Sequence, residues 1–106
     1  MFDIEIHEEA LKEIQELPPA LQSKMTRQID KLAAFGTTLR ELDTKPLRNG
    51  FFELRAKAGD TGRAIYVYQK GKRIFILKVF IKDTAKLPPA MLNTAANRLE
   101  EMLNGN

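Results

Sequence analysis

Residues 51–81 have the sequence FFELRAKAGDTGRAIYVYQKGKRIFILKVFI, which contains three segments rich in aromatic and aliphatic residues, separated by glycine-containing turns. Such segments between turn signals are typical of β-strands, so we expect strands at residues 51–57, 63–69 and 73–81. Lys70-Gly71-Lys72 predicts a tight hairpin between the last two strands, and residues 58–62 join the first two. The stretch therefore predicts a three-stranded antiparallel meander.

The residues before this meander change their period from two to that of a helix. Phe2, Ile4 and Ile6 alternate with polar residues and predict a short first strand. From His7 onward the apolar spacing is helical, and Pro18-Pro19 separates this helix from a second one that ends near Gly36. The second helix has an inner stripe of Leu21, Met25, Ile29 and Leu32. We expect the two helices to form an antiparallel hairpin.

A third helix follows Pro88-Pro89, where apolar residues recur at helical spacing between residues 92 and 103. The complete order is β-α-α-β-β-β-α. This order predicts an α+β fold with a twisted, mainly antiparallel sheet that is backed by the helical hairpin. A length of 106 residues fits one domain, which we place at residues 1–106.

The composition excludes several classes of site. The chain has no cysteine and one histidine, so it can form neither a thiolate site nor a His-paired catalytic dyad, and we expect no metal and no cofactor. Its N-terminus lacks the basic and apolar regions of a secretory signal, and no apolar run reaches the length of a membrane span. We therefore expect a cytoplasmic protein.

The charge is distributed unevenly along the chain. Residues 1–43 carry five Lys and Arg against nine Asp and Glu, whereas residues 44–89 carry eleven against three. A basic segment of this kind suits an anionic partner such as nucleic acid, although a solvated lysine-rich surface has the same composition.

Alternation within the strands sorts the meander onto two faces. If the purely aliphatic sets pack against the helices, the second face carries Arg55, Tyr66, Tyr68, Lys78, Phe80 and Lys82. Cations interleaved with aromatic rings suit single-stranded RNA, because bases stack on the rings and phosphates pair with the cations. A half-exposed antiparallel sheet without a ligand shows similar residues. Arg63 has the parity of Ile65, so it reaches this face only through a bulge or an irregular strand end.

Three motifs together resemble a known family. They are GFFELR at residues 50–55, GRAIY at 62–66 and FIKDTAKLP at 80–88. In this order and spacing the chain resembles the RelE/HigB superfamily of toxins, in particular the phage-derived HigB-like branch. Asp83 and Ala85 depart from that branch, which usually has lysine at the first position and often glutamine at the second.

The resemblance implies the toxin of a toxin–antitoxin pair, an endoribonuclease that cuts mRNA, usually on the ribosome, and thereby inhibits translation. The implied partner is an antitoxin with a helix-turn-helix domain. By position, Arg55 and Arg63 match the family's paired arginines, and Lys82 and Lys86 its terminal basic pair. The candidate catalytic residues are Arg55, Arg63 and Lys82. The candidate RNA-binding residues are Lys45, Arg48, Tyr66, Tyr68, Lys78, Phe80 and Lys86.

These residues fit a metal-independent reaction. Arg55 and Arg63 could brace the phosphate, and Lys82 could transfer a proton if neighbouring cations lower its pKa. We expect Glu53 to be an ion-pair partner of Arg55, and His7 to be a surface or capping residue. Two other interpretations stay open: a non-catalytic module that binds RNA or a protein partner, which Asp83 and Ala85 favour, and a structural phage protein.

Overall fold

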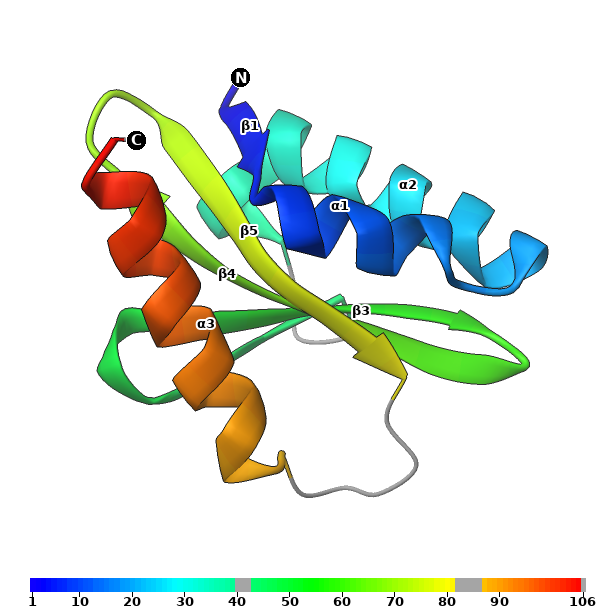
Figure 1. The fold of residues 1–106 in the computed structure, drawn as a ribbon. Coiled ribbons are helices and arrows are strands. Elements are labelled where there is room, and N and C mark those ends of the chain that lie inside the picture. The colour runs from blue at the N-terminus through cyan, green and yellow to red at the C-terminus, as the bar shows by residue number, and fades with distance from the viewer. Residues whose placement is uncertain (40–42, 82–86, 106) are drawn as a thin grey trace.

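The computed structural model describes residues 1–39, 43–81 and 87–105 (Figure 1). The elements in chain order are β1 (Asp3–Ile6), α1 (Glu8–Gln15), α2 (Pro19–Phe35), β2 (Thr44–Pro46), β3 (Phe52–Ala58), β4 (Asp60–Gln69), β5 (Arg73–Ile81) and α3 (Pro89–Leu103). Single 3₁₀ turns lie at Gly36–Thr38 and Arg48–Gly50. The predicted α+β order is confirmed, with β2 as an additional short strand and with β4 beginning at Asp60 instead of residue 63.

The strands form one sheet in the order β1-β5-β4-β3-β2. β1 runs parallel to β5, and the other neighbouring strands are antiparallel. Gly59 and Gly71 both adopt a φ of 78° in the β3–β4 and β4–β5 turns, a conformation that glycine tolerates without steric cost. The mainly antiparallel meander follows from the alternating sequence and these turn residues.

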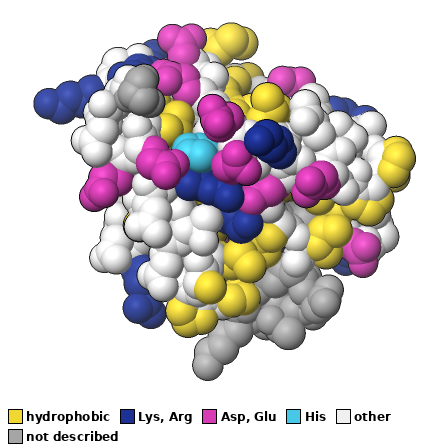
Figure 2. Space-filling view, in the orientation of Figure 1, with side chains coloured by type: hydrophobic (Ala, Val, Ile, Leu, Met, Phe, Trp, Pro, Cys, Tyr) yellow, Lys and Arg dark blue, Asp and Glu magenta, His cyan; other side chains and the backbone are white. Residues whose placement is uncertain are grey.

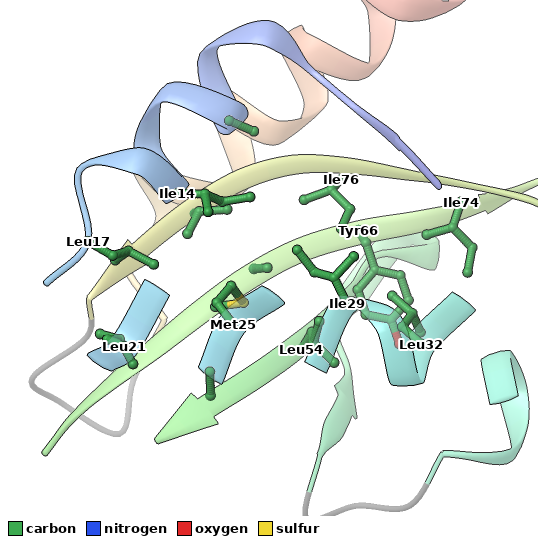
Figure 3. Close-up of a cluster of buried hydrophobic side chains, with 14 residues drawn as sticks. Ile14, Leu17, Leu21, Met25, Ile29, Leu32, Leu54, Tyr66, Ile74 and Ile76 are labelled. Atoms are coloured by element: carbon green, nitrogen blue, oxygen red, sulfur yellow. The ribbon is translucent and has the colours of Figure 1, made fainter. Parts of the chain in front are cut away.

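The helical hairpin covers one face of the sheet, as predicted. The stripe of α2 that includes Leu21, Met25 and Leu32 packs on side chains from β3, β4 and β5 (Figure 3). α2 ends at Gly36, where φ is 50° and a Cβ atom would collide with the ring of Phe2. The hairpin and the sheet therefore enclose the first hydrophobic core.

The other face of the sheet is covered by α3, a helix whose presence was predicted but whose position on this face was not. Ile65, Val67, Phe75 and Leu77 pack there with Ala95 of α3 in a second buried cluster. In Figure 1, α3 crosses β4 and β5 on the side opposite to α1 and α2. Both faces of the sheet are covered by helices, so both need apolar residues. A set of aliphatic residues along a strand therefore does not show which face packs against the helical hairpin.

A β-bulge explains the remaining error in the predicted faces. Between Ile65 and Tyr66 the pairing of β4 with β5 shifts by one residue, so that Leu77 has no direct partner in the register. The bulge reverses the parity of the rest of β5. Val79 consequently packs with the hairpin, while Phe80 lies on the side of α3. Ile65, Val67, Leu77 and Val79 are all buried, as predicted, but they do not share one face.

Polar contacts fasten α3 to α1 and to β5. The two terminal nitrogens of the Arg98 guanidinium group, Nη1 and Nη2, donate to the two carboxylate oxygens of Glu13 at 2.9 and 3.0 Å. Nη1 also donates to the carbonyl of Leu77. Glu13 additionally accepts from the Val79 amide at 2.9 Å. His7 caps α1 by accepting from the Glu9 amide and contacts Glu101 of α3 at 2.6 Å. The capping role predicted for His7 is confirmed, although the residue is buried.

None of the helices in the described ranges is long and apolar enough to span a membrane.

Candidate nucleic-acid interface

Arg55 and Arg63 lie directly opposite each other on neighbouring strands. β3 and β4 pair in a register that joins these two residues, so their side chains emerge from the same face of the sheet. α3 packs over β4 and β5 of this face and leaves both side chains partly accessible, with 32% of the Arg55 side chain and 15% of the Arg63 side chain exposed. Two planar, permanently charged groups are thus presented together.

Glu53 lies beneath the two arginines. Its side chain is 1% exposed, and one of its carboxylate oxygens accepts from Nη1 of Arg63 at 2.6 Å. Nε of Arg55 lies 3.8 Å from the same oxygen. Two cations in adjacent strand positions would repel each other, and a shared carboxylate offsets that repulsion. The predicted ion pair between Glu53 and Arg55 is present, and the closer partner is Arg63.

Further side chains of the same face surround this group. Lys45 of β2 pairs in register with Glu53, and Phe80 of β5 pairs with Arg63, so both emerge on the side of the arginines. Lys57 follows Arg55 at the same parity and is exposed. We call this set, with the buried Glu53, the arginine surface: Lys45, Glu53, Arg55, Lys57, Arg63 and Phe80. Its four cations and one carboxylate give it a net positive charge.

A hollow of about 500 Å³ continues the arginine surface around the edge of β3. It is lined by Lys24, Gln28, Asp43, Arg55, Lys57, Thr61 and Arg63. Lys24 and Gln28 belong to α2, and Gln28 donates to the carbonyl of Arg55 at 2.7 Å, which holds the helix against the strand edge. We call this hollow the β3-edge pocket.

Two other hollows differ in their chemistry. One of about 790 Å³ lies beside His7 and is lined by Glu8, Glu9 and Glu101, whose carboxylates repel phosphate. Figure 2 shows acidic side chains gathered around the chain's single histidine. The other, of about 630 Å³, lies between α3 and the Arg48–Gly50 turn and is mainly apolar, with Arg48 at its wall. Neither contains the paired arginines.

Comparison with known proteins places the chain in a family. Residues 12–100 match the family model of the phage-derived Gp49-like proteins. The chain belongs to this family. A search of the curated proteins found no match.

Solved structures show that the Gp49-like chain has the fold of RelE toxins. An Escherichia coli RelE mutant in the free state is 18% identical with a TM-score of 0.67, covering 92% of this chain and 97% of its own. The isolated E. coli RelE toxin is 15% identical with a TM-score of 0.61, covering 93% and 99%. A chain of the Mycobacterium tuberculosis RelBE2 toxin–antitoxin complex is 21% identical with a TM-score of 0.59, covering 76% and 98%.

The predicted position of the tyrosines is wrong. In the Gp49-like chain Tyr66 is 1% exposed and lies on the hairpin side, where its ring stacks on Phe52 at 5.6 Å between centroids. Tyr68 packs on the same side, against Phe2 and Phe52. Both rings therefore face away from Arg55, because Tyr66 is paired with Phe52 and not with a residue of the arginine surface.

The predicted position of Lys78 is also wrong. Its ammonium group donates to Glu13 of α1 at 2.7 Å, so it contributes to the contacts that hold α1 and α3 on β5. Lys82 and Lys86 lie outside the described residues. The structure thus brings Lys45, Arg55, Arg63 and Phe80 together and places Arg48 at the separate apolar hollow.

Sequence reasoning missed several residues of the interface, among them Lys24, Gln28 and Lys57. Lys57 has the same parity as Arg55, and this alternation could have identified it. Lys24 and Gln28 lie outside the apolar stripe of α2, and their position beside Arg55 depends on how α2 crosses the edge of β3. No local pattern in the sequence carries that information.

Proposed function

We propose that this Gp49-like protein is the toxin of a toxin–antitoxin pair and that it cleaves mRNA without a metal ion, in association with the ribosome. The observation that carries the proposal is the pair Arg55 and Arg63, presented side by side over a buried Glu53 on an accessible sheet face. The RelE fold and the family match support the same function.

The arginine pair suits one phosphate that passes through a more negative transition state. Two guanidinium groups can donate several hydrogen bonds to the phosphoryl oxygens, and their charge is independent of pH in the physiological range. Groups fixed before the reaction stabilise the developing charge most effectively, and Glu53 fixes Arg63. Phe80, opposite Arg63, packs against the cluster on the side of α3 and is half-buried, and a neighbouring base would stack on the exposed part of its ring.

Cleavage by attack of a ribose 2′-hydroxyl also requires proton transfer. Within the described part of the chain, the only carboxylate of the arginine surface is Glu53, which is already bonded to Arg63. We therefore retain Lys82 as the proposed proton-transfer residue and Lys86 as an RNA-binding residue. Alignment of the mRNA on the ribosome would compensate for a sparse set of acid–base groups.

The test is inducible expression with growth measurement and mapping of new RNA 5′ ends. Arg55→Ala, Arg63→Ala and Lys82→Ala should each lower cleavage by about 100-fold or more, the scale of losing one transition-state donor. Lys82→Arg should not restore full activity if Lys82 transfers a proton, because arginine stays charged. Lys70→Ala, in the β4–β5 turn, is the matched control. Full cleavage by all three alanine variants would overturn the assignment.

The proposed partner is an antitoxin with a helix-turn-helix domain, encoded next to this gene. An acidic helix of that partner would cover the arginine surface, and one of the solved relatives is a toxin–antitoxin complex. Co-expression of the neighbouring gene should restore growth. Continued growth arrest with each adjacent gene would count against the pairing.

A non-catalytic RNA-binding module is the second candidate. It is favoured by the arrangement of Glu53, whose carboxylate is committed to the arginines. Binding of mRNA and growth inhibition without any new 5′ ends would identify this alternative.

A further inference from the structure

The arginine surface does not end at the paired arginines. β2 pairs with residues 52–54 of β3, and within the described residues 1–39, 43–81 and 87–105 no strand pairs with the second half of β3 on that side. The β3-edge pocket lies there and connects Arg55 and Arg63 with Lys24 of α2. A strand of RNA that binds the arginines can therefore continue into this pocket.

The charge of the pocket favours phosphate. Four of its lining residues are cations, and Asp43 is the one carboxylate among them. That carboxylate accepts from Gln28 at 2.8 Å and from Lys31 at 3.2 Å. The bonds from Gln28 and Lys31 and the nearby charge of Lys24 hold the pKa of Asp43 below its ordinary value, so it stays ionised. The four lining cations exceed this one carboxylate, and Lys24 and Lys57 contribute two of the charges at the edge of β3.

The walls of the pocket are fixed by the backbone. The Arg55 amide donates to the carbonyl of Asp43 at 2.8 Å, and the Arg55 carbonyl accepts from the buried Gln28. Lys24 is half-buried, lies one helical turn before Gln28 and lines the same pocket. A volume of about 500 Å³ falls within the range of sites that hold nucleotide-sized ligands.

We propose that the β3-edge pocket is a second phosphate subsite, in which Lys24 and Lys57 bind the phosphate that follows the one held by Arg55 and Arg63. This inference rests on the proposed function, because it extends the same RNA site. It implies that the substrate is a single strand that runs across the edge of β3 toward α2. A compact hairpin loop that contacts only the arginine surface would not reach Lys24.

The test is binding of a fluorescent single-stranded RNA of about ten nucleotides, measured by anisotropy over a range of salt concentrations. A 2′-deoxy version of the same oligonucleotide prevents cleavage during the measurement. Loss of one phosphate contact should reduce the slope of log K against log salt by about 0.7. Lys24→Ala and Lys57→Ala should each show this reduction and bind roughly two- to fivefold more weakly.

Arg27→Ala is the matched control, because Arg27 is an exposed cation of α2 that does not line the pocket. It should retain the wild-type slope. Thermal unfolding of each variant confirms that it is folded. Wild-type slopes for both lysine variants would overturn the subsite, whether or not the protein cleaves RNA. Lys24-dependent binding, together with no new RNA 5′ ends in the expression test, would support the subsite and overturn the nuclease. No binding of RNA by the wild type would overturn both.

Discussion

At the scale of single residues, Glu53 determines how the two arginines are presented. It is a buried carboxylate that shares its charge between neighbouring strands. Removing one partner from a buried ion pair leaves an uncompensated charge and is more costly than replacing both partners with apolar groups. Glu53 is therefore both a structural residue and a positioning residue for Arg63.

Glu53→Gln keeps the size of the side chain but removes the charge between Arg55 and Arg63. We expect it to lower the free energy of unfolding by about 3 kcal/mol, as for other broken buried pairs. Urea unfolding provides the measurement. In a double variant, Arg63→Met should recover part of the loss, because no unpaired charge remains at that position. A loss below about 1 kcal/mol would show that the pair behaves as an exposed one.

Tyr66 gives the fold a sensitivity to alkaline pH. Burial raises the pKa of Tyr66 far above its ordinary value, and burial also raises that of Tyr68. The unfolded chain loses these protons near pH 10, before the folded chain does, so the folded state loses stability as the pH rises above that value.

We expect urea unfolding curves to show falling stability between about pH 9.5 and 11. Tyr66→Phe, which has no titratable hydroxyl, should flatten this dependence. Tyr68→Phe should have a smaller effect, because Tyr68 is less buried. Equal slopes for wild type and Tyr66→Phe would contradict the assignment.

At the scale of elements, α3 depends on Glu13. Burial alone would raise the pKa of this carboxyl, but bonds from Arg98, Lys78 and the Val79 amide together lower it. Because the pKa of Glu13 is lower in the folded chain than in the unfolded chain, ionisation of this carboxyl stabilises the fold. This stabilisation is complete above the ordinary pKa near 4.5 and is lost as the pH falls below it.

Glu13→Gln should therefore reduce the free energy of unfolding at neutral pH. In this variant the free energy of unfolding should also change less with pH between about pH 5 and 3. Hydrogen exchange of the α3 amides should accelerate in this variant, since Arg98 loses its charged partner. Glu9→Gln is the control, because the one ion pair of Glu9 within the described part of the chain is an exposed pair with Lys12. Unchanged exchange in α3 would indicate that the apolar stripe alone holds the helix.

The elements also show which features the sequence could predict. Strand and helix positions follow from local periods and from Gly71 and Pro18, which act within a few residues. The opposition of Arg55 and Arg63 was not predicted from parity, because it depends on the register between strands. The side of Tyr66 could not be predicted either, since α3 gives the second face a core of its own. Lys24 and Arg55 line the same pocket because α2 packs against the edge of β3. No pattern in the sequence near either residue predicts this tertiary arrangement.

At the scale of the whole molecule, the arginine surface and the β3-edge pocket carry an excess of cations. Carboxylates gather around His7 at the α1–α3 contact, where Figure 2 also shows Lys or Arg side chains among them. The cation excess of the arginine surface orients the protein toward an anionic strand during approach.

Single-stranded RNA should accordingly stabilise the folded protein against heat. At an RNA concentration of 100 times Kd the gain is about 2.7 kcal/mol, which raises Tm by about 10 °C or more in a domain of this size. The shift should disappear at high salt and in an Arg55→Ala/Arg63→Ala variant. A shift of the same size in that variant would place RNA binding elsewhere on the molecule.

The parallel pairing of β1 with β5 has a consequence for biosynthesis. Asp3–Ile6 pair with Arg73–Ile76, so the first strand has no partner until some seventy further residues have been added. At about 5 to 20 residues per second this takes several seconds, during which the apolar stripe of α2 has no complete sheet to cover. An mRNA that ends before the codon for Ile76 therefore yields a chain in which β1 cannot form its complete pairing with β5. The arginine surface likewise forms late in the protein's own translation.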